Sequence, residues 1–174
     1  LAPTSPYLAL AMTRLLAAPI LVANAMVSIA QAQSFLGQDV ITTSADSVQS
    51  VYAIDLDGDG DADVLSASSL DDEVVWYENQ GGGVFGSKQV ITQNAIEAYS
   101  VYATDLDGDG DSDVLSASVG DSKIAWYGND GVGNFTPEQV ITTGADGAVS
   151  VYATDLDGDG DADVLSASIS DNKV

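Results

Sequence analysis

One segment occurs three times in this chain at intervals of 50 residues, and this repetition restricts the possible fold more than any other feature. The copies cover residues 51–68, 101–118 and 151–168, and they differ at very few positions, such as Ile54 against Thr104. A fixed period of this length is typical of architectures in which each repeat is one supersecondary unit packed against its neighbours. The sequence therefore predicts a stack of small, nearly identical units.

The aromatic residues follow the same period, which indicates how the repeats run. Apart from Tyr99, the phenylalanines, tyrosines and tryptophans of residues 33–174 recur at constant offsets. We therefore divide this region into repeats 35–84, 85–134 and 135–174, and we expect the rings to pack between neighbouring units. The third repeat stops at Val174, so that about 2.8 repeats are present, and we expect the sequence to be a fragment that lacks C-terminal repeats or domains.

Each repeat is expected to contain four short strands, which the second repeat shows clearly. Runs of β-branched and aromatic residues at 89–92, 100–104, 114–118 and 123–127 are separated by stretches rich in Gly, Asn, Asp and Ser. These patterns indicate strands and turns, and no window after the N-terminal segment has the apolar period of a helix. Four strands in a repeat of this length are typical of a β-propeller blade. The predicted fold class is all-β, with propeller blades of four antiparallel strands that form an incomplete propeller.

Residues 1–32 have the features of a secretory signal peptide. The segment contains no acidic residue, and Arg14 precedes an apolar run over residues 15–27. The segment ends with Ala30 and Ala32, the arrangement of small residues that signal peptidase recognises, which predicts cleavage before Gln33. We expect the natural start to be Met12. An uncleaved membrane anchor is the alternative, although the apolar run is shorter than the about 20 residues that a span needs.

The repeated segment contains an acidic loop with aspartates at alternate positions, and we predict that it binds calcium. Such a run of like charges would repel severely without a counter-ion, and Ca²⁺ takes six to eight oxygen ligands from loops of this kind. Gly58 and Gly60 permit the tight turn that wrapping an ion requires. Mg²⁺ is the weaker candidate because it retains several waters. The candidate ligands are Asp55, Asp57, Asp59, Asp61, Asp63, Asp105, Asp107, Asp109, Asp111, Asp113, Asp155, Asp157, Asp159, Asp161 and Asp163.

An EF-hand is the alternative structure for an acidic loop of this spacing. The EF-hand loop needs a bidentate glutamate at its twelfth position, whereas Ser66 occupies that position here. Residues 64–68 also predict a strand rather than the helix that leaves an EF-hand. These differences disfavour a dockerin-like pair of EF-hands, and we expect Asp63 and its equivalents to supply the closing carboxylate.

The Asp-x-Asp-Gly-Asp-Gly-x-x-Asp loop followed by a strand resembles the FG-GAP and VCBS-type repeats. The resemblance covers about residues 35–174; Phe85-Gly86 matches the Phe-Gly of the motif, and the Gly-Ala-Pro half is absent. It implies calcium loops between the strands of propeller blades, as in the head of integrin alpha chains. It also implies side-chain ligation by the first, third, fifth and ninth loop residues and main-chain ligation by the seventh: Asp55, Asp57, Asp59, Asp63 and, through its carbonyl, Asp61.

The composition excludes several classes of function. The chain has 27 acidic and 4 basic residues, a net charge of −23, and neither histidine nor cysteine. Nucleic acid is excluded because binding phosphates needs clustered Lys and Arg. Disulfides, thiol nucleophiles and Ser-His triads are excluded by the missing residue types. We therefore expect a secreted or cell-surface module that is not an enzyme, that has no membrane span in its mature part and that binds a protein or glycan ligand, for example in adhesion.

Two alternative functions remain open. The chain fits a purely structural cell-surface repeat, and it also fits the non-catalytic propeller region of a larger secreted enzyme that acts on glycans or lipids. Catalysis within the chain itself would need paired carboxylates, as in glycoside hydrolysis. The acids available for this outside the loops include Asp71, Asp72, Glu73 and Glu78.

Overall fold

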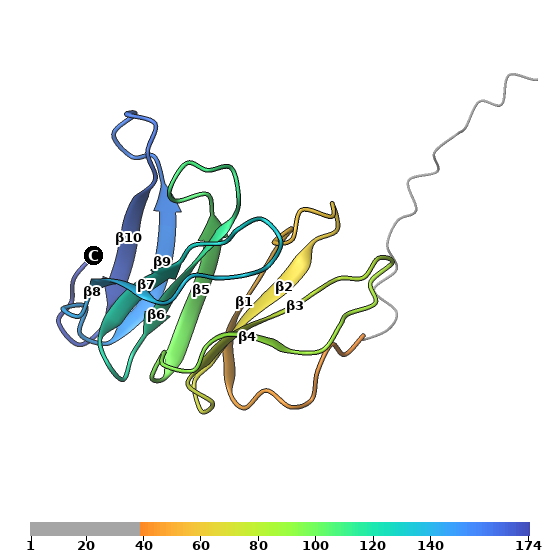
Figure 1. The fold of residues 1–174 in the computed structure, drawn as a ribbon. Coiled ribbons are helices and arrows are strands. Elements are labelled where there is room, and N and C mark those ends of the chain that lie inside the picture. Colours follow the sequence, from red (N-terminus) through yellow and green to blue (C-terminus); the bar gives the residue numbers. More distant parts are fainter. Residues whose placement is uncertain (1–38) are drawn as a thin grey trace, which may run out of the picture. The chain divides into compact units, whose positions relative to one another are not determined.

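Short runs of β-branched and aromatic residues form ten strands in residues 39–174, the part of the chain that the computed structural model describes (Figure 1). The predicted signal peptide over residues 1–32 lies outside the described residues. The first four strands are β1 (Val48–Ile54), β2 (Asp63–Ser68), β3 (Glu73–Tyr77) and β4 (Gln89–Thr92). The next four are β5 (Ala98–Thr104), β6 (Asp113–Ser118), β7 (Lys123–Tyr127) and β8 (Gln139–Thr142). The last two are β9 (Ala148–Thr154) and β10 (Asp163–Ser168).

The strands form three antiparallel sheets in chain order. Two sheets have four strands each, ordered β1-β2-β3-β4 and β5-β6-β7-β8, and the third pairs β9 with β10. The register repeats with the sequence, since Tyr52 faces Leu65 in the first sheet and Tyr102 faces Leu115 in the second. The described residues contain no helix, so none that is long and apolar enough to cross a membrane. The all-β class and the four-stranded antiparallel sheets are therefore confirmed.

The sheets do not begin where the repeats of the sequence were set to begin. Strand β4 belongs by sequence to the second repeat, 85–134, but it pairs with β3 of the first sheet, where Val90 lies opposite Val75. Strand β8 pairs with β7 in the same way. A period in a sequence does not say where a unit starts, and here the backbone hydrogen bonds place each border about 10 residues further along the chain.

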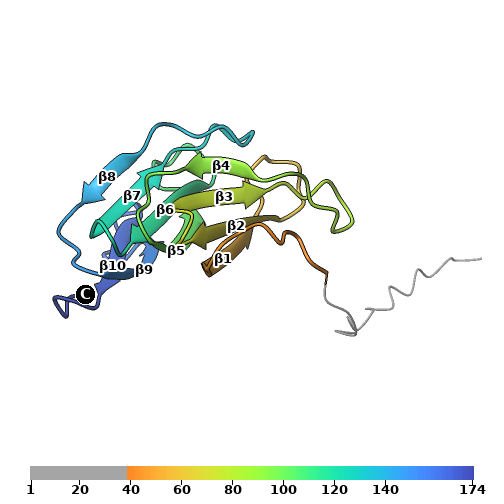
Figure 2. The same ribbon diagram turned by 90° about the horizontal axis from the view of Figure 1, so that it is seen from below.

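The hydrophobic core lies between the sheets. Leu65 and Val74 of the first sheet belong to the same buried cluster as Val101 and Ala103 of β5. The second interface uses the equivalent residues of the next two sheets in a separate cluster. Figure 2 shows β1, β5 and β9 side by side along one side of the unit, with β4 and β8 on the opposite side. The second and third sheets therefore each pack their first strand, β5 or β9, against the previous sheet. This arrangement fits propeller-like blades.

Aromatic side chains pack between neighbouring sheets, as expected. The rings of Tyr52, Tyr102 and Tyr152 form a row, with centroids 5.0 and 4.6 Å apart. The rings of Trp76 and Phe135 meet edge to face at 6.5 Å, within the range in which such pairs add stability beyond their buried area. These contacts join the sheets at two separate places along the interface.

Candidate metal centre

The acidic loops connect the first strand of each sheet to the second, and they lie at the same end of the three sheets (Figure 1). The turn in the first loop depends on Gly58 and Gly60, whose φ angles are 76° and 95°. Residues with a Cβ rarely adopt such angles, which is why glycine occupies both positions. The same two glycines have positive φ in the other loops, so all three loops follow one path.

The first aspartate of each loop holds the turn closed. In the first loop the Oδ1 atom of Asp55 accepts a hydrogen bond from Gly58 N at 2.8 Å, and its Oδ2 atom accepts one from Gly60 N at 2.9 Å. The equivalent bonds of Asp105 and Asp155 are 2.6 to 3.1 Å long. Backbone amides that point at a carboxylate fix its orientation.

The last aspartate of the loop is buried and lies at the start of the second strand. Asp63 and Asp113 are 0% exposed. The carboxylate of Asp63 accepts hydrogen bonds from Leu56 N at 2.9 Å and from Asn79 N at 2.8 Å. Leu106 N and Asn129 N donate equivalent bonds to Asp113. A carboxylate oxygen has more than one lone pair, so these bonds leave room for a cation.

Three aspartates of each loop come together in a geometry that suits one cation. One carboxylate oxygen from each residue lies within 4.8 Å of the others in the group. Ligand oxygens 2.3–2.6 Å from a Ca²⁺ ion are separated by distances of this order, and carboxylates are the ligands that hard cations prefer. The residues therefore fit a calcium ion. The groups are Asp55, Asp57 and Asp63; Asp105, Asp107 and Asp113; and Asp155, Asp157 and Asp163.

The structure does not bring every predicted ligand into these groups. Asp59, Asp61 and their equivalents lie outside them. The Oδ1 atom of Asp59 instead accepts a hydrogen bond from Asp61 N at 2.8 Å, and the other two loops repeat this bond. Ligation by the side chain of Asp59 and by the carbonyl of Asp61 stays a prediction from the sequence.

The surroundings of two loop aspartates disfavour their negative charge. Burial raises the pKa of Asp57, and the nearby charge of Asp63 raises it further. Burial also raises the pKa of Asp113, although the amides of Leu106 and Asn129 oppose that shift. A bound divalent cation would offset both the burial and the repulsion, because an opposite charge at close range favours the ionised carboxylate.

The third loop is less enclosed than the other two. Asp163 is half-buried and accepts a bond from Leu156 N at 3.0 Å, but the described residues supply no counterpart of the second amide that Asp63 receives from Asn79. Leu156 is 62% exposed, whereas the equivalent Leu56 is 1% exposed. The loops therefore share their path and differ in their surroundings.

The sequence reasoning missed one functional position, the asparagine after the third strand. Asn79 and Asn129 occupy this position and donate their backbone N–H groups to the buried carboxylates. The signal was present, since an asparagine recurs there at the 50-residue spacing, but the contexts Glu-Asn-Gln-Gly at Asn79 and Gly-Asn-Asp-Gly at Asn129 indicate only turns.

Three of the acids that catalysis would need have structural partners instead. The carboxylate of Asp71 accepts a hydrogen bond from Asp46 N, and that of Asp72 accepts one from Glu97 N, both at 2.8 Å. Glu73 is buried and forms an ion pair with Lys88 at 2.7 Å. These contacts hold turns and strands together, so they account for the three acids without a reaction.

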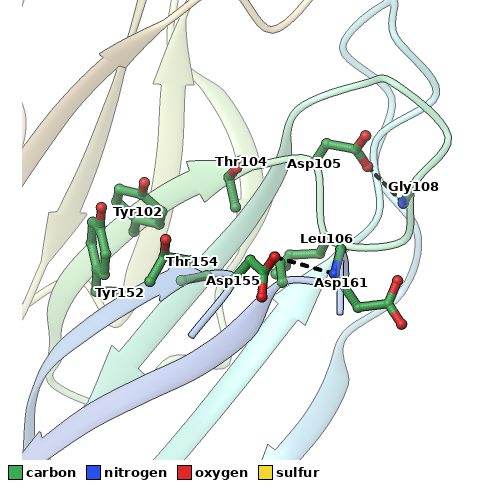
Figure 3. Close-up of a pocket in the computed structure, with 12 residues that line it drawn as sticks. Tyr102, Thr104, Asp105, Leu106, Gly108, Tyr152, Thr154, Asp155 and Asp161 are labelled. Atoms are coloured by element: carbon green, nitrogen blue, oxygen red, sulfur yellow. Dashed lines mark hydrogen bonds between the residues drawn. The ribbon is translucent and has the colours of Figure 1, made fainter. Parts of the chain in front are cut away.

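A cleft of about 320 Å³ opens between the second and third loops beside the tyrosine row. Figure 3 shows Tyr102 and Tyr152 next to each other at one end and the carboxylates of Asp105 and Asp155 further along. The residues that line it include Tyr102, Thr104, Asp105, Leu106, Tyr152 and Thr154. Aromatic rings, hydroxyl groups and carboxylates therefore line the cleft.

Comparison with known proteins finds similarity in the repeats. A family model described as FG-GAP-like repeat matches residues 55–116 and 105–166. Each match begins at one acidic loop, includes the following acidic loop and ends in the strand after it, β6 or β10. A solved structure of an Agrocybe aegerita lectin, described as recognising non-reducing terminal N-acetylglucosamine, is 25% identical with a TM-score of 0.49. The similarity covers 67% of this chain and 32% of the lectin, so the chain spans about a third of that protein. The comparison with curated proteins gave no match.

Proposed function

The chain belongs to the FG-GAP-like repeat family, and from this premise we propose that it is a calcium-stabilised, propeller-type module that binds a ligand outside the cell and has no catalytic activity. One observation carries the proposal. The same three aspartates come together in each of three loops, with one oxygen of each within 4.8 Å of the others. Three copies of one arrangement of carboxylates are difficult to explain as solvated turns, because each copy concentrates negative charge.

Calcium suits these loops better than other cations. The donors are oxygens of carboxylates and carbonyls, and the chain has no histidine or cysteine to favour a softer metal. The loops are exposed and turn at glycine, which suits the flexible coordination of Ca²⁺ better than the rigid octahedron of Mg²⁺. When bound, calcium would supply the positive charge that the carboxylates lack.

The residues of the chain would do the rest. Asp55 and its equivalents hold the turn through two amides, and Asp63 anchors the loop to the second strand. Leu56, between them, is 1% exposed, so a change in the loop acts directly on the core between the sheets. Calcium would therefore contribute to the stability of the sheets as well as to that of the loop.

The cleft beside the tyrosine row is the proposed ligand site. Its aromatic rings and hydroxyl groups suit a small polar group on a protein or a glycan. An extracellular setting agrees with the predicted signal peptide. In that setting we expect weak calcium binding, with a Kd of about 10⁻⁴–10⁻³ M, as in other extracellular modules.

Thermal unfolding tests the calcium part of the proposal. The full chain is melted with increasing Ca²⁺ and with chelator, at constant ionic strength, and the β signal is followed by circular dichroism. Calcium at 100 times its Kd should stabilise the fold by about 2.7 kcal/mol for each site. The control is the triple variant Asp57→Asn, Asp107→Asn, Asp157→Asn, whose melting temperature should respond little. An equal response of both proteins, or none from the natural chain, would mean that the loops do not bind calcium.

A further inference from the structure

Asn129 touches two acidic loops at once. It follows β7, its side chain is 5% exposed, and its Nδ2 atom donates to Leu56 O at 2.7 Å and to Ser112 O at 3.0 Å. Leu56 belongs to the first loop and Ser112 to the second. The orientation of the amide is determined by these two partners, because a carbonyl oxygen accepts bonds only from the NH₂ end.

The residues around Asn129 extend this link. The backbone N–H of Asn129 donates to the Oδ1 atom of Asp113 at 2.8 Å, and Asp113 is one of the three grouped carboxylates of the second loop. Two positions on, Gly131 lies against Asp111 of the same loop, since a Cβ there would be about 2.5 Å from the carboxylate. The carbonyl of Gly131 faces the first loop, 3.2 Å from where a Cβ of Gly58 would be. Residues 129–131 are therefore packed between the two loops.

The equivalent residue of the first sheet makes no such link. The Nδ2 atom of Asn79 donates to Ala62 O at 3.1 Å, and its backbone N–H donates to Asp63. Both acceptors belong to its own sheet's loop, 55–63. The two asparagines thus share the local contact, and among the described residues Asn129 alone adds the bond to another loop.

We propose that Asn129 is a positioning residue that couples loops 55–63 and 105–113, so that a calcium ion in either loop raises the affinity of the other. The inference rests on the proposed calcium function. Leu56, whose carbonyl Asn129 holds, stands between the grouped carboxylates of Asp55 and Asp57. An ion held by Asp113 would further restrain that carboxylate and, through the bond from Asn129 N, the side chain that holds Leu56 O, so the first loop would lose less conformational freedom when it binds. Because coupling is reciprocal, the first loop must affect the second to the same extent.

Site-resolved calcium titration tests the coupling. The full chain is labelled with ¹⁵N, calcium chloride alone is added, and the glycine amides of each loop are followed by NMR. These amides donate to the first aspartate of their loop, so they report each site separately. The Asn129→Ala variant should weaken both the first and the second loop by about 2- to 10-fold, the range expected for one hydrogen bond. The third loop, which Asn129 does not contact, serves as the internal reference.

The Asn79→Ala variant is the matched control, and it should weaken the first loop only. A second variant, Asp107→Asn, tests the coupling even if Asn129→Ala does not fold, because it removes a ligand of the second loop and leaves Asn129 in place. In Asp107→Asn, the loss of calcium binding by the second loop should weaken calcium binding by the first loop by a factor similar to that expected for Asn129→Ala. If the loops bind calcium but neither Asn129→Ala nor Asp107→Asn changes the calcium affinity of the first loop, the coupling is overturned and the proposed function stands. No calcium-dependent shift in any loop would overturn the proposed function as well.

Discussion

Replacing Lys123 by methionine should destabilise the second sheet, because this lysine forms ion pairs with two carboxylates and, among residues 39–174, is the only cation paired with either of them. Its side chain is 9% exposed, and its Nζ atom lies 2.9 Å from Asp121 and 2.8 Å from Glu138. It also donates to Asn94 O at 2.7 Å. Burial by itself would lower the pKa of Lys123, but the two carboxylates outweigh it and raise the pKa, so the charged form is favoured.

The size of the stability loss in Lys123→Met follows from how far its two partner carboxylates are exposed to water. Removing one member of a buried ion pair costs about 3–5 kcal/mol, because the other charge is left without compensation. The carboxylates of Asp121 and Glu138 keep 23% and 24% of their exposure, and water can therefore solvate them in part. We expect a loss of about 2–3 kcal/mol, which lowers the melting temperature of a unit of this size by about 7–10 °C.

Urea and thermal unfolding of Lys123→Met measure this loss, and the chain supplies its own control. The first sheet has the same pair with the charges exchanged, Glu73 with Lys88, at the equivalent positions. The double variant Lys123→Glu, Glu138→Lys copies that arrangement and should recover part of the stability, although Asn94 O loses its donor. A Lys123→Met protein that unfolds at the same urea concentration as the natural chain would refute the reasoning.

Three other changes test the fold in matched pairs. Leu56→Ala should cost about 2–5 kcal/mol in urea unfolding, and Leu156→Ala under 0.5, because the first leucine is 1% exposed and the second 62%. Gly133→Ala should cost more than Gly83→Ala by about 1–3 kcal/mol. Both have positive φ, but only at 133 would the new Cβ lie 2.6 Å from an indole ring, so equal losses would contradict the packing. Burial opposes ionisation of Glu73, yet hydrogen bonds from its lysine and glutamine partners lower its pKa below 4.5. The contribution of Glu73 to the free energy of unfolding is therefore present above pH 4.5 and lost as the pH falls through the lower pKa of the folded protein. In urea unfolding at a series of pH values, Glu73→Gln should lose less stability on acidification than the natural chain.

The strands and the loops were predictable from the sequence because both depend on local interactions. The run at 123–127 forms β7 with the predicted bounds, and the runs at 100–104 and 114–118 form β5 and β6 with one or two residues added. Period, β-branched content and turn residues act within a few positions of one another. The same holds for Gly58, whose place in the acidic loop already required a positive φ.

The borders of the sheets and the membership of the metal groups were not predictable in the same way. Strand β4 could pair within its own repeat or with the preceding strands, and only the hydrogen bonds to β3 decide. The family resemblance assigned the side chain of Asp59 the same ligand role as that of Asp57, whereas in the structure the Oδ1 atom of Asp59 accepts a hydrogen bond from Asp61 N and Asp59 lies outside the group of three carboxylates. A spacing rule has no information about the direction of a side chain in an irregular loop.

Nearly identical segments show most clearly what each level determines. The sequence by itself determined the repeat, the four-strand pattern and a loop rich in carboxylates, since these follow from residue types at short spacing. It assigned the same environment to Val51 and Val101, which are 66% and 5% exposed, and to Asn79 and Asn129, of which one bonds within its loop and the other links two. Only the tertiary structure decided these differences, because equal residues become unequal through the neighbours that pack against them.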